Sequence, residues 1–200
     1  MSDPPPAQDR AAVARAVAAL IGALGLDEAA EPELRDTPAR VADLYAEVFS
    51  GLDPRAAPEI ATFEHVGGAD AEQLVAVRDL PFYSLCVHHF VPFFGRAHIA
   101  YLPGETIIGI SGAARLLEHY ARRPQLQERI TAQIADHLER LLRPRGVAVA
   151  LEARHLCMEM RGIRTPGTVE TRIVRGALAE PRWAGLFAPA REGAAPDDVG

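Results

Sequence analysis

The order of two kinds of apolar segment restricts the fold of this chain more than any other feature. Runs rich in Val, Ile, Phe and Tyr occupy residues 74–83 and 90–102, and two further alternating runs occupy residues 147–158 and 168–178. Each run has the composition and borders of a β-strand. The loop between the first two runs is short, which favours antiparallel pairing. Two helical patterns separate the two pairs of strands, so the sequence predicts an α+β fold with its helices on one face of an antiparallel sheet.

The helical patterns are recognised by apolar residues at spacings of three and four. Residues 111–121 form one such pattern, and a second opens at Pro124 and ends before Pro144. Two more patterns lie upstream, one over residues 10–26 and one that starts at Asp36 as a capping residue. These upstream segments predict an N-terminal helical arm that packs on its own domain or on a sister subunit.

Composition divides the 200 residues into four parts. The first residues include three consecutive prolines and no apolar pattern, which is typical of disorder. The last residues are rich in Ala, Pro, Gly and Asp, which is typical of a loose tail. The expected division is a disordered N-terminus at 1–9, a helical arm at 10–52, one catalytic domain at 53–180 and a loose C-terminal tail at 181–200.

The charge and cysteine content exclude several classes of protein. The formal net charge is −6, which argues against sequence-independent binding to nucleic acid. The sequence has no run of 18 apolar residues and no secretory signal at its start, so we expect no membrane span and a cytoplasmic location. Two cysteines are too few for a disulfide framework and fit a reducing compartment.

Chemistry-bearing residues are densest at Cys86-Val87-His88-His89. Cys86 and His89 stand three residues apart, a spacing that lets one tight loop present a thiolate and an imidazole to one ion. A distant Cys157 would complete three protein ligands, the number that catalytic zinc sites use while they keep a position open for water. The same residues are also compatible with two buried thiols, with one disulfide, or with histidines that cap a loop.

Two histidines remain beside such a site. His155 stands two residues before Cys157, and residues two apart in a strand face the same side. His88 adjoins a ligand in the loop. A metal-bound water of lowered pKa next to two groups that titrate near neutrality suits hydrolysis of a carbon–nitrogen bond. The other histidines show no grouping: we expect His98 in a strand, and three to be solvated, namely His65, His119 and His137.

The segment from Cys86 to Gly95, which reads CVHHFVPFFG, resembles the zinc-binding segment of the GTP cyclohydrolase I family. The likeness continues in order from about Leu34 to Leu178. Several separate motifs in the same order are far more specific than any one of them. The further matching segments are DTPARV at 36–41, AYLP at 100–103, GIS at 109–111, RRPQLQER at 122–129, HLCM at 155–158 and RGIR at 161–164.

The resemblance implies the tunnelling fold, a four-stranded antiparallel sheet with two helices on one face, assembled into ring-shaped homodecamers with active sites between subunits. It implies a cytoplasmic hydrolase that converts GTP to formate and 7,8-dihydroneopterin triphosphate, the first step of folate and pterin synthesis. The positions that match the family's Zn²⁺ ligands are Cys86, His89 and Cys157. Those that match its catalytic residues are His88, His155 and Ser111. Those that match its substrate-binding residues are Gln127 and Glu128 for the guanine, and Arg40, Arg115 and Arg161 for the triphosphate.

Three positions depart from the family pattern near the implied site. Val87 replaces a usual Glu, Gly112 replaces a phosphate-binding Lys, and Glu159 stands where Lys or Met is usual. The last two changes make the phosphate end less positive, and a charge-assisted contact is worth roughly 1.5–3 kcal/mol. The departures leave open a divergent relative that acts on another guanine nucleotide, or a non-catalytic member that binds a purine or pterin. A nitrile reductase relative needs a lone nucleophilic Cys and no zinc, which the three metal-ligand positions argue against.

Overall fold

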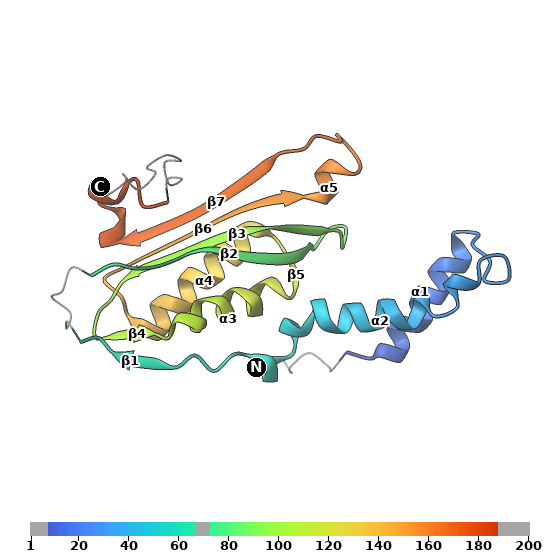
Figure 1. Ribbon diagram of the computed structural model, residues 1–200, viewed down its shortest axis with the longest axis horizontal. Helices are drawn as coiled ribbons and strands as arrows, with labels where there is room; N and C mark the ends of the chain where they lie inside the picture. Colours follow the sequence, from blue (N-terminus) through green and yellow to red (C-terminus); the bar gives the residue numbers. More distant parts are fainter. Residues whose placement is uncertain (1–7, 67–72, 188–200) are drawn as a thin grey trace, which may run out of the picture.

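A sheet with two helices packed against one face forms the centre of the structure, a computed structural model that describes residues 8–66 and 73–187 (Figure 1). The expected α+β class is confirmed. The expected disordered N-terminus lies mostly outside the described residues. No helix within the described ranges is long and apolar enough to cross a bilayer.

The main sheet has the strand order β5-β2-β3-β6-β7. Its four long strands pair antiparallel in turn, and the two-residue strand β5 adds to the edge parallel to β2. A second, two-stranded antiparallel sheet joins β1 to β4. The strands are β1 (Thr62–Glu64), β2 (Val75–Cys86), β3 (Pro92–Leu102), β4 (Thr106–Ile108), β5 (Pro124–Gln125), β6 (Gly146–His155) and β7 (Thr168–Gly176).

Helices α3 (Ile110–Ala121) and α4 (Gln127–Leu142) cover one face of this sheet (Figure 1). Both are amphipathic, and their apolar sides meet the inward-facing residues of β2, β3 and β6 in the main core. Leu116 of α3 and Ile134 of α4 are fully buried there. Removing these side chains from water is the main force that fixes the two helices on the sheet.

The expected start of the second helix is wrong. Pro124 and Gln125 pair with the end of β2 as strand β5, and α4 begins only at Gln127. Proline lacks an N–H and so suits a sheet edge of this kind as well as a first helical turn. Because β5 pairs with the end of β2, the start of α4 lies next to the strand that carries Cys86.

The third long strand is also shorter than expected. β6 ends at His155, and Leu156–Glu159 forms the short helix α5 instead of continuing the strand. His155 and Cys157 therefore do not share a strand face by alternation. They lie near each other because the chain turns into a helix directly after His155.

The chain that follows β7 covers part of the opposite face of the sheet. Two short turns, η4 (Ala177–Ala179) and η5 (Pro181–Trp183), bring Leu178 and Phe187 against the alanines of β3 and β6. Trp183, Leu186 and Phe187 pack in this cluster, although the sequence predicts a loose tail from residue 181. The remaining residues of that predicted tail, 188–200, lie outside the described part of the chain.

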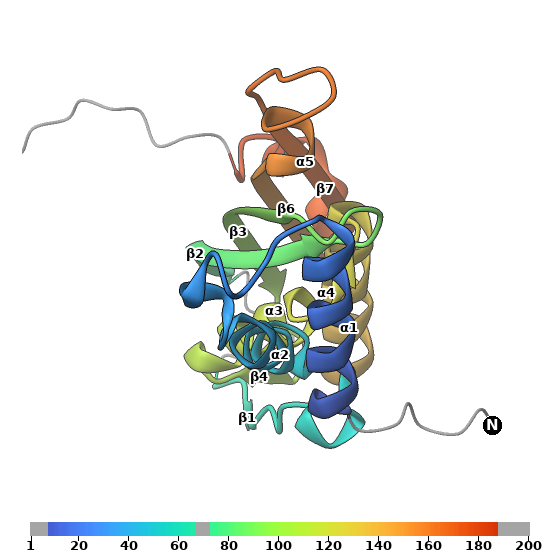
Figure 2. The ribbon, with the colours of Figure 1, turned by 90° about the vertical axis from the view of Figure 1, so that its right-hand side faces the viewer.

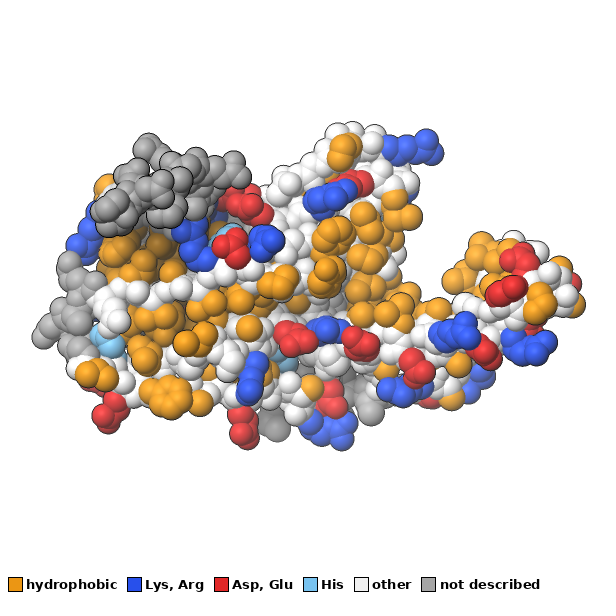
Figure 3. Space-filling view, viewed as in Figure 1, with side chains coloured by type: hydrophobic (Ala, Val, Ile, Leu, Met, Phe, Trp, Pro, Cys, Tyr) orange, Lys and Arg blue, Asp and Glu red, His pale blue; other side chains and the backbone are white. Residues whose placement is uncertain are grey.

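The N-terminal arm projects from the end of the sheet, with its two helices side by side (Figures 1 and 2). Its helices are α1 (Arg10–Ala23) and α2 (Thr37–Val48), linked by the turn η1 (Pro32–Leu34). No residue of α1 is buried, and Leu24 at its C-cap exposes 66% of its surface. Figure 3 shows hydrophobic side chains gathered along the hollow between the sheet and the arm.

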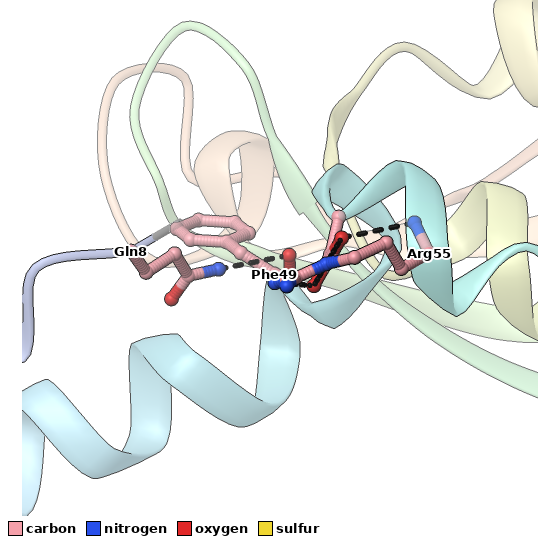
Figure 4. Close-up of polar contacts among 4 residues, drawn as sticks. Gln8, Phe49 and Arg55 are labelled. Carbon is pink, nitrogen blue, oxygen red and sulfur yellow. Dashed lines mark hydrogen bonds and ion pairs between the residues drawn. The ribbon is translucent and has the colours of Figure 1, made fainter. Parts of the chain in front are cut away.

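The arm returns to the body through two turns, η2 (Ser50–Leu52) and η3 (Pro54–Ala56). Gln8 donates a hydrogen bond of 2.9 Å from its Nε2 to the carbonyl of Phe49, which ties the start of α1 to the end of α2 (Figure 4). Beside them, Arg55 pairs with Asp53. Asp36 stands at the N-cap of α2, but its carboxylate pairs with Arg40 and does not cap the backbone.

Candidate active site

The loop after β2 holds Cys86 and His89 in a tight turn. The Phe90 N–H donates to the Cys86 carbonyl at 2.8 Å, and the Cys86 N–H donates to the Val91 carbonyl at 3.0 Å. Phe90 has φ = 54°, a left-handed conformation that closes the turn. As a result, the Sγ of Cys86 lies 3.8 Å from the Nδ1 of His89.

Helix α5 brings the third sulfur to this loop. The ligand atoms of Cys86, His89 and Cys157 all lie within 4.8 Å of one another, so the three side chains can hold a metal ion. Two ligand atoms on a tetrahedral zinc are about 3.5 Å apart at ordinary bond lengths, so small side-chain rotations suffice. Burial and the neighbouring Cys86 raise the pKa of the Cys157 thiol. A bound cation reverses that preference because it stabilises thiolates.

Arg161 also contacts this group. Its guanidinium donates a hydrogen bond of 3.0 Å to the Nε2 of His89. The contact crosses from the loop after α5 to the loop after β2, so one arginine from the predicted triphosphate set lies beside the candidate metal centre.

His155 is held between a phenyl ring and a buried amide. It pairs with Phe93 across β6 and β3, and the two rings stack at 4.7 Å with planes only 4° apart. Its Nε2 lies 2.8 Å from the Oε1 of Gln127. Burial lowers the pKa of His155, and the negative charges of Glu128 and Glu159 oppose this effect.

A cavity of about 250 Å³ joins these groups. The Glu128 carboxylate stands in the first turn of α4 at its rim, and the Cys86 and Cys157 thiols line it together with His88 and His155. His88 is exposed, with its Nδ1 3.9 Å from the sulfur of Cys86. The cavity therefore combines two of the three candidate metal ligands, two histidines outside that set, and one carboxylate.

Three of the predicted site residues lie apart from both this cavity and the candidate ligand group within one chain. Ser111 stands at the start of α3, next to Ile108 of β4, whose N–H donates to Tyr101 at the far end of β3. The 12 residues of α3 span about 18 Å, which separates Ser111 from the Cys86 end of the sheet. Arg115 lies on the same helix beside Ser50 and Pro58. Arg40 lies on the arm, paired with Asp36 at 3.2 Å.

The structure gives a packing reason for one departure from the family pattern and a charge partner for another. A Cβ at Gly112 would lie 3.0 Å from the Cγ2 of Ile60, so a longer residue there requires that neighbour to move. Glu159, whose side chain is 11% exposed, is paired with Arg154 through two hydrogen bonds. That arginine holds the pKa of the Glu159 carboxyl below its usual range. Nothing in the structure explains Val87.

Sequence reasoning did not identify the residues that stack on His155 or form hydrogen bonds next to Gln127. Phe93 lies inside the recognised motif, but its stacking on His155 depends on the β3–β6 register. Thr131 and Thr171 come from α4 and β7, and they bond to each other at 2.7 Å next to Gln127. Neither threonine stands in a motif, so only the fold brings them to the site.

The fold and the site together define a class of protein: an α+β enzyme with three residues that can hold a metal ion beside a histidine and a carboxylate. The sequence profile of the GTP cyclohydrolase I family matches residues 13–185. GTP cyclohydrolase 1 of Halalkalibacterium halodurans is 49% identical over 173 residues, which cover 86% of this chain and 90% of that protein. GTP cyclohydrolase 1 of Geobacillus kaustophilus is 52% identical over 167 residues, which cover 82% and 86%.

The chain belongs to the GTP cyclohydrolase I family. Among solved structures, archaeosine synthase QueF-Like in the apo form is similar with a TM-score of 0.42 and 16% identity, over 52% of this chain and 95% of that one.

Proposed function

We propose that this chain is a zinc-dependent GTP cyclohydrolase I, which hydrolyses the imidazole ring of the guanine in GTP and yields formate and 7,8-dihydroneopterin triphosphate. One observation carries the proposal: two members of the three-residue group that can hold a metal, Cys86 and Cys157, line one cavity with His155 and Glu128. This reaction needs a metal that activates water, a proton donor and a carboxylate that recognises guanine.

We assign zinc to the metal position because of its donor set. Two thiolates and one imidazole suit Zn²⁺, and three protein ligands leave a fourth position for water, as in other catalytic Cys₂His sites. When bound, zinc supplies a water whose pKa is lowered to about 7 as the nucleophile for the ring carbon. The three residues that would hold it are Cys86, His89 and Cys157.

Recognition of guanine is assigned to Glu128. A carboxylate accepts hydrogen bonds from two adjacent N–H donors, which guanine presents at its ring nitrogen and amino group and adenine does not. Glu128 stands at the rim of the cavity in the first turn of α4. Gln127 precedes it, and the first N–H groups of a helix have no partner within the helix. The Gln127 N–H is therefore suited to the guanine carbonyl.

Proton transfer is assigned to His155, which donates to nitrogen 7 of the guanine ring. His88 lies in the same cavity. In this assignment it acts with Ser111 on the ribose after formate has left. Arg161 contacts the triphosphate together with Arg115 and Arg40.

The positions of Ser111, Arg115 and Arg40 support a site completed by a second copy of the chain. All three lie apart from the cavity within one subunit, and the apolar faces of the arm are exposed. We assign the chain to the tunnelling fold, with a catalytic domain over residues 53–180 and an arm over residues 10–52 that packs between copies. The assembly is a ring-shaped homodecamer.

The proposal is tested with purified, zinc-analysed protein and GTP, by following formate and the pterin absorbance together. His155→Ala should abolish formate release while the zinc content stays at the wild-type level. Zinc-loaded wild-type protein that leaves GTP intact contradicts the proposal, and loss of zinc in His155→Ala contradicts the role given to that residue. Turnover of GTP, GDP and GMP in parallel identifies the substrate, since a strong preference for GTP excludes the shorter nucleotides.

A further inference from the structure

The side-chain amide of Gln127 forms hydrogen bonds within the protein at the lining of the cavity. Gln127 is the first residue of α4 and is only 2% exposed. Its Nε2 donates to the carbonyls of Leu151 and Val169, each at 2.9 Å, and lies 3.2 Å from the Thr171 hydroxyl. Its Oε1 lies 2.8 Å from the Nε2 of His155. Both N–H donors of this amide are therefore used within the protein, and its oxygen is directed to His155.

The surroundings fix which way this amide points. Carbonyl oxygens only accept hydrogen bonds, so the two carbonyls of Leu151 and Val169 require the NH₂ end of Gln127 on their side. The Oε1 end must then face His155, and an amide oxygen also only accepts. The Nε2 of His155 therefore carries a hydrogen, and Nδ1 is the ring nitrogen that remains for proton exchange in the cavity.

We propose that Gln127 is a positioning residue, whose buried amide holds His155 in the Nε2–H tautomer with Nδ1 directed to the substrate. This inference rests on the proposed role of His155. The Phe93 ring, stacked on the imidazole at 4.7 Å, fixes the ring plane, and the Gln127 bond fixes the rotation within that plane. Together they leave the imidazole one orientation, which is the requirement for efficient proton transfer.

The hydroxyl network around Gln127 has one consistent set of hydrogens. Thr131 donates to the backbone carbonyl of Gln127 at 2.9 Å and lies 2.7 Å from the Thr171 hydroxyl. Thr171 must then donate to Thr131, while the two hydrogens of the Gln127 amide go to the carbonyls of Leu151 and Val169. The chain of bonds joins α4, β6 and β7 to His155, so the orientation of the imidazole is set by the main body of the fold.

The test compares two Gln→Met substitutions on the same helix. Gln127→Met keeps the length of the side chain and removes the acceptor for His155, so kcat for GTP should fall about 10- to 100-fold with KM and zinc content unchanged. Gln133→Met is the matched control, because Gln133 bonds to Gln125 and not to His155, and its kcat should stay within about threefold of wild type. A raised KM with normal kcat in Gln127→Met, or an equal kcat loss in the control, overturns the inference.

A second measurement does not depend on turnover. Nitrogen-15 spectra of the zinc-loaded protein, assigned with His155→Ala, should show the Nε2–H form of His155 in wild type and a mixture of tautomers in Gln127→Met. An Nδ1–H form in wild type overturns the inference, even where Gln127→Met does not fold. If wild-type protein shows the Nε2–H form but releases no formate, the proposed function is contradicted. The positioning of the ring by Gln127 is not.

Discussion

Arginine supplies every permanently cationic side chain of this protein, because all 21 of its Lys and Arg residues are arginine. The absence of lysine at position 112 is therefore a property of the whole chain and not a change confined to the phosphate end of the site. Arginine binds phosphate oxygens through two parallel N–H donors, which lysine does not offer. The loss of one lysine thus leaves Arg161, Arg115 and Arg40 for the proposed triphosphate contacts.

Glu159 should matter less for GTP affinity than its charge alone indicates. Its carboxylate is already paired with Arg154, and the arginine side chain is more than half exposed, so solvent screens the pair. We expect Glu159→Met to change the KM for GTP by less than about threefold and to have little effect on stability. Arg154→Met is the matched partner variant. A tenfold drop in KM for Glu159→Met would show that Glu159 opposes phosphate binding.

The metal ligands can be told from the neighbouring histidine by substitution. His88 and His89 both lie within 4 Å of the Cys86 sulfur, but only His89 belongs to the three-ligand group. We expect Cys157→Ser and His89→Ala to lose at least about nine-tenths of the bound zinc, because a site left with two ligands holds the ion poorly. His88→Ala should keep its zinc. Metal analysis after dialysis measures the difference, and zinc loss in His88→Ala with retention in His89→Ala would reverse the assignment.

At the scale of elements, the junction of α3 and α4 holds a second pair of histidines. His119 accepts a hydrogen bond from Arg123, and His137 bonds to the hydroxyl of Tyr120. Burial lowers the pKa of His119 to about 4, and the positive charges of Arg123 and His137 act in the same direction. Burial also lowers the pKa of His137. The sequence predicts both histidines to be solvated, and the structure shows this to be wrong.

This junction should make stability depend on pH in a defined window. The folded state keeps His119 neutral, whereas the unfolded chain binds a proton below about pH 6.5. The contribution is therefore complete above pH 6.5 and is lost as the pH falls towards 4. We expect a loss of about 1–2 kcal/mol after allowance for solvent near this partly exposed ring. Denaturant unfolding at pH 7, 5.5 and 4.5 measures it, and an equally steep decline in His119→Gln would contradict the assignment.

Element types could be read from the sequence where periodicity was strong, and boundaries could not. The four long strands and both core helices follow from their apolar patterns. The end of β6 at His155 and the pairing of Pro124 with Leu85 depend on contacts between distant segments. The candidate metal ligands could be predicted from their spacing and motif. The position of His155 between Phe93 and Gln127 could not, because it depends on the β3–β6 register and on where α4 starts. No local sequence pattern predicts the strand register or the start of α4.

At the scale of the whole molecule, the proposed site is divided between copies of the chain. In the proposed assembly, each subunit would contribute one half that contains His155 and another half that contains Arg115 and Ser111, with Ser111 about the length of α3 away. The exposed leucines of the arm give such copies an apolar surface to bury, with Leu20 at 57% and Leu44 at 51% exposure. A divided site predicts that defects in different halves complement each other.

Mixing two inactive variants tests this arrangement directly. His155→Ala lacks one half of the site, and the double variant Ser111→Ala/Arg115→Ala lacks the other. Co-expressed in equal amounts and assembled at random, they should restore about one-quarter of wild-type formate release, because half of all His155 halves are intact and half of those meet an intact partner half. His155→Ala mixed with His88→Ala is the control, since both defects fall in the same half and no complementation follows. Equal and negligible activity in both mixtures, with assembly confirmed by sedimentation, would contradict a site divided between subunits, and an active Ser111→Ala/Arg115→Ala variant would show that these two residues have no part in the site.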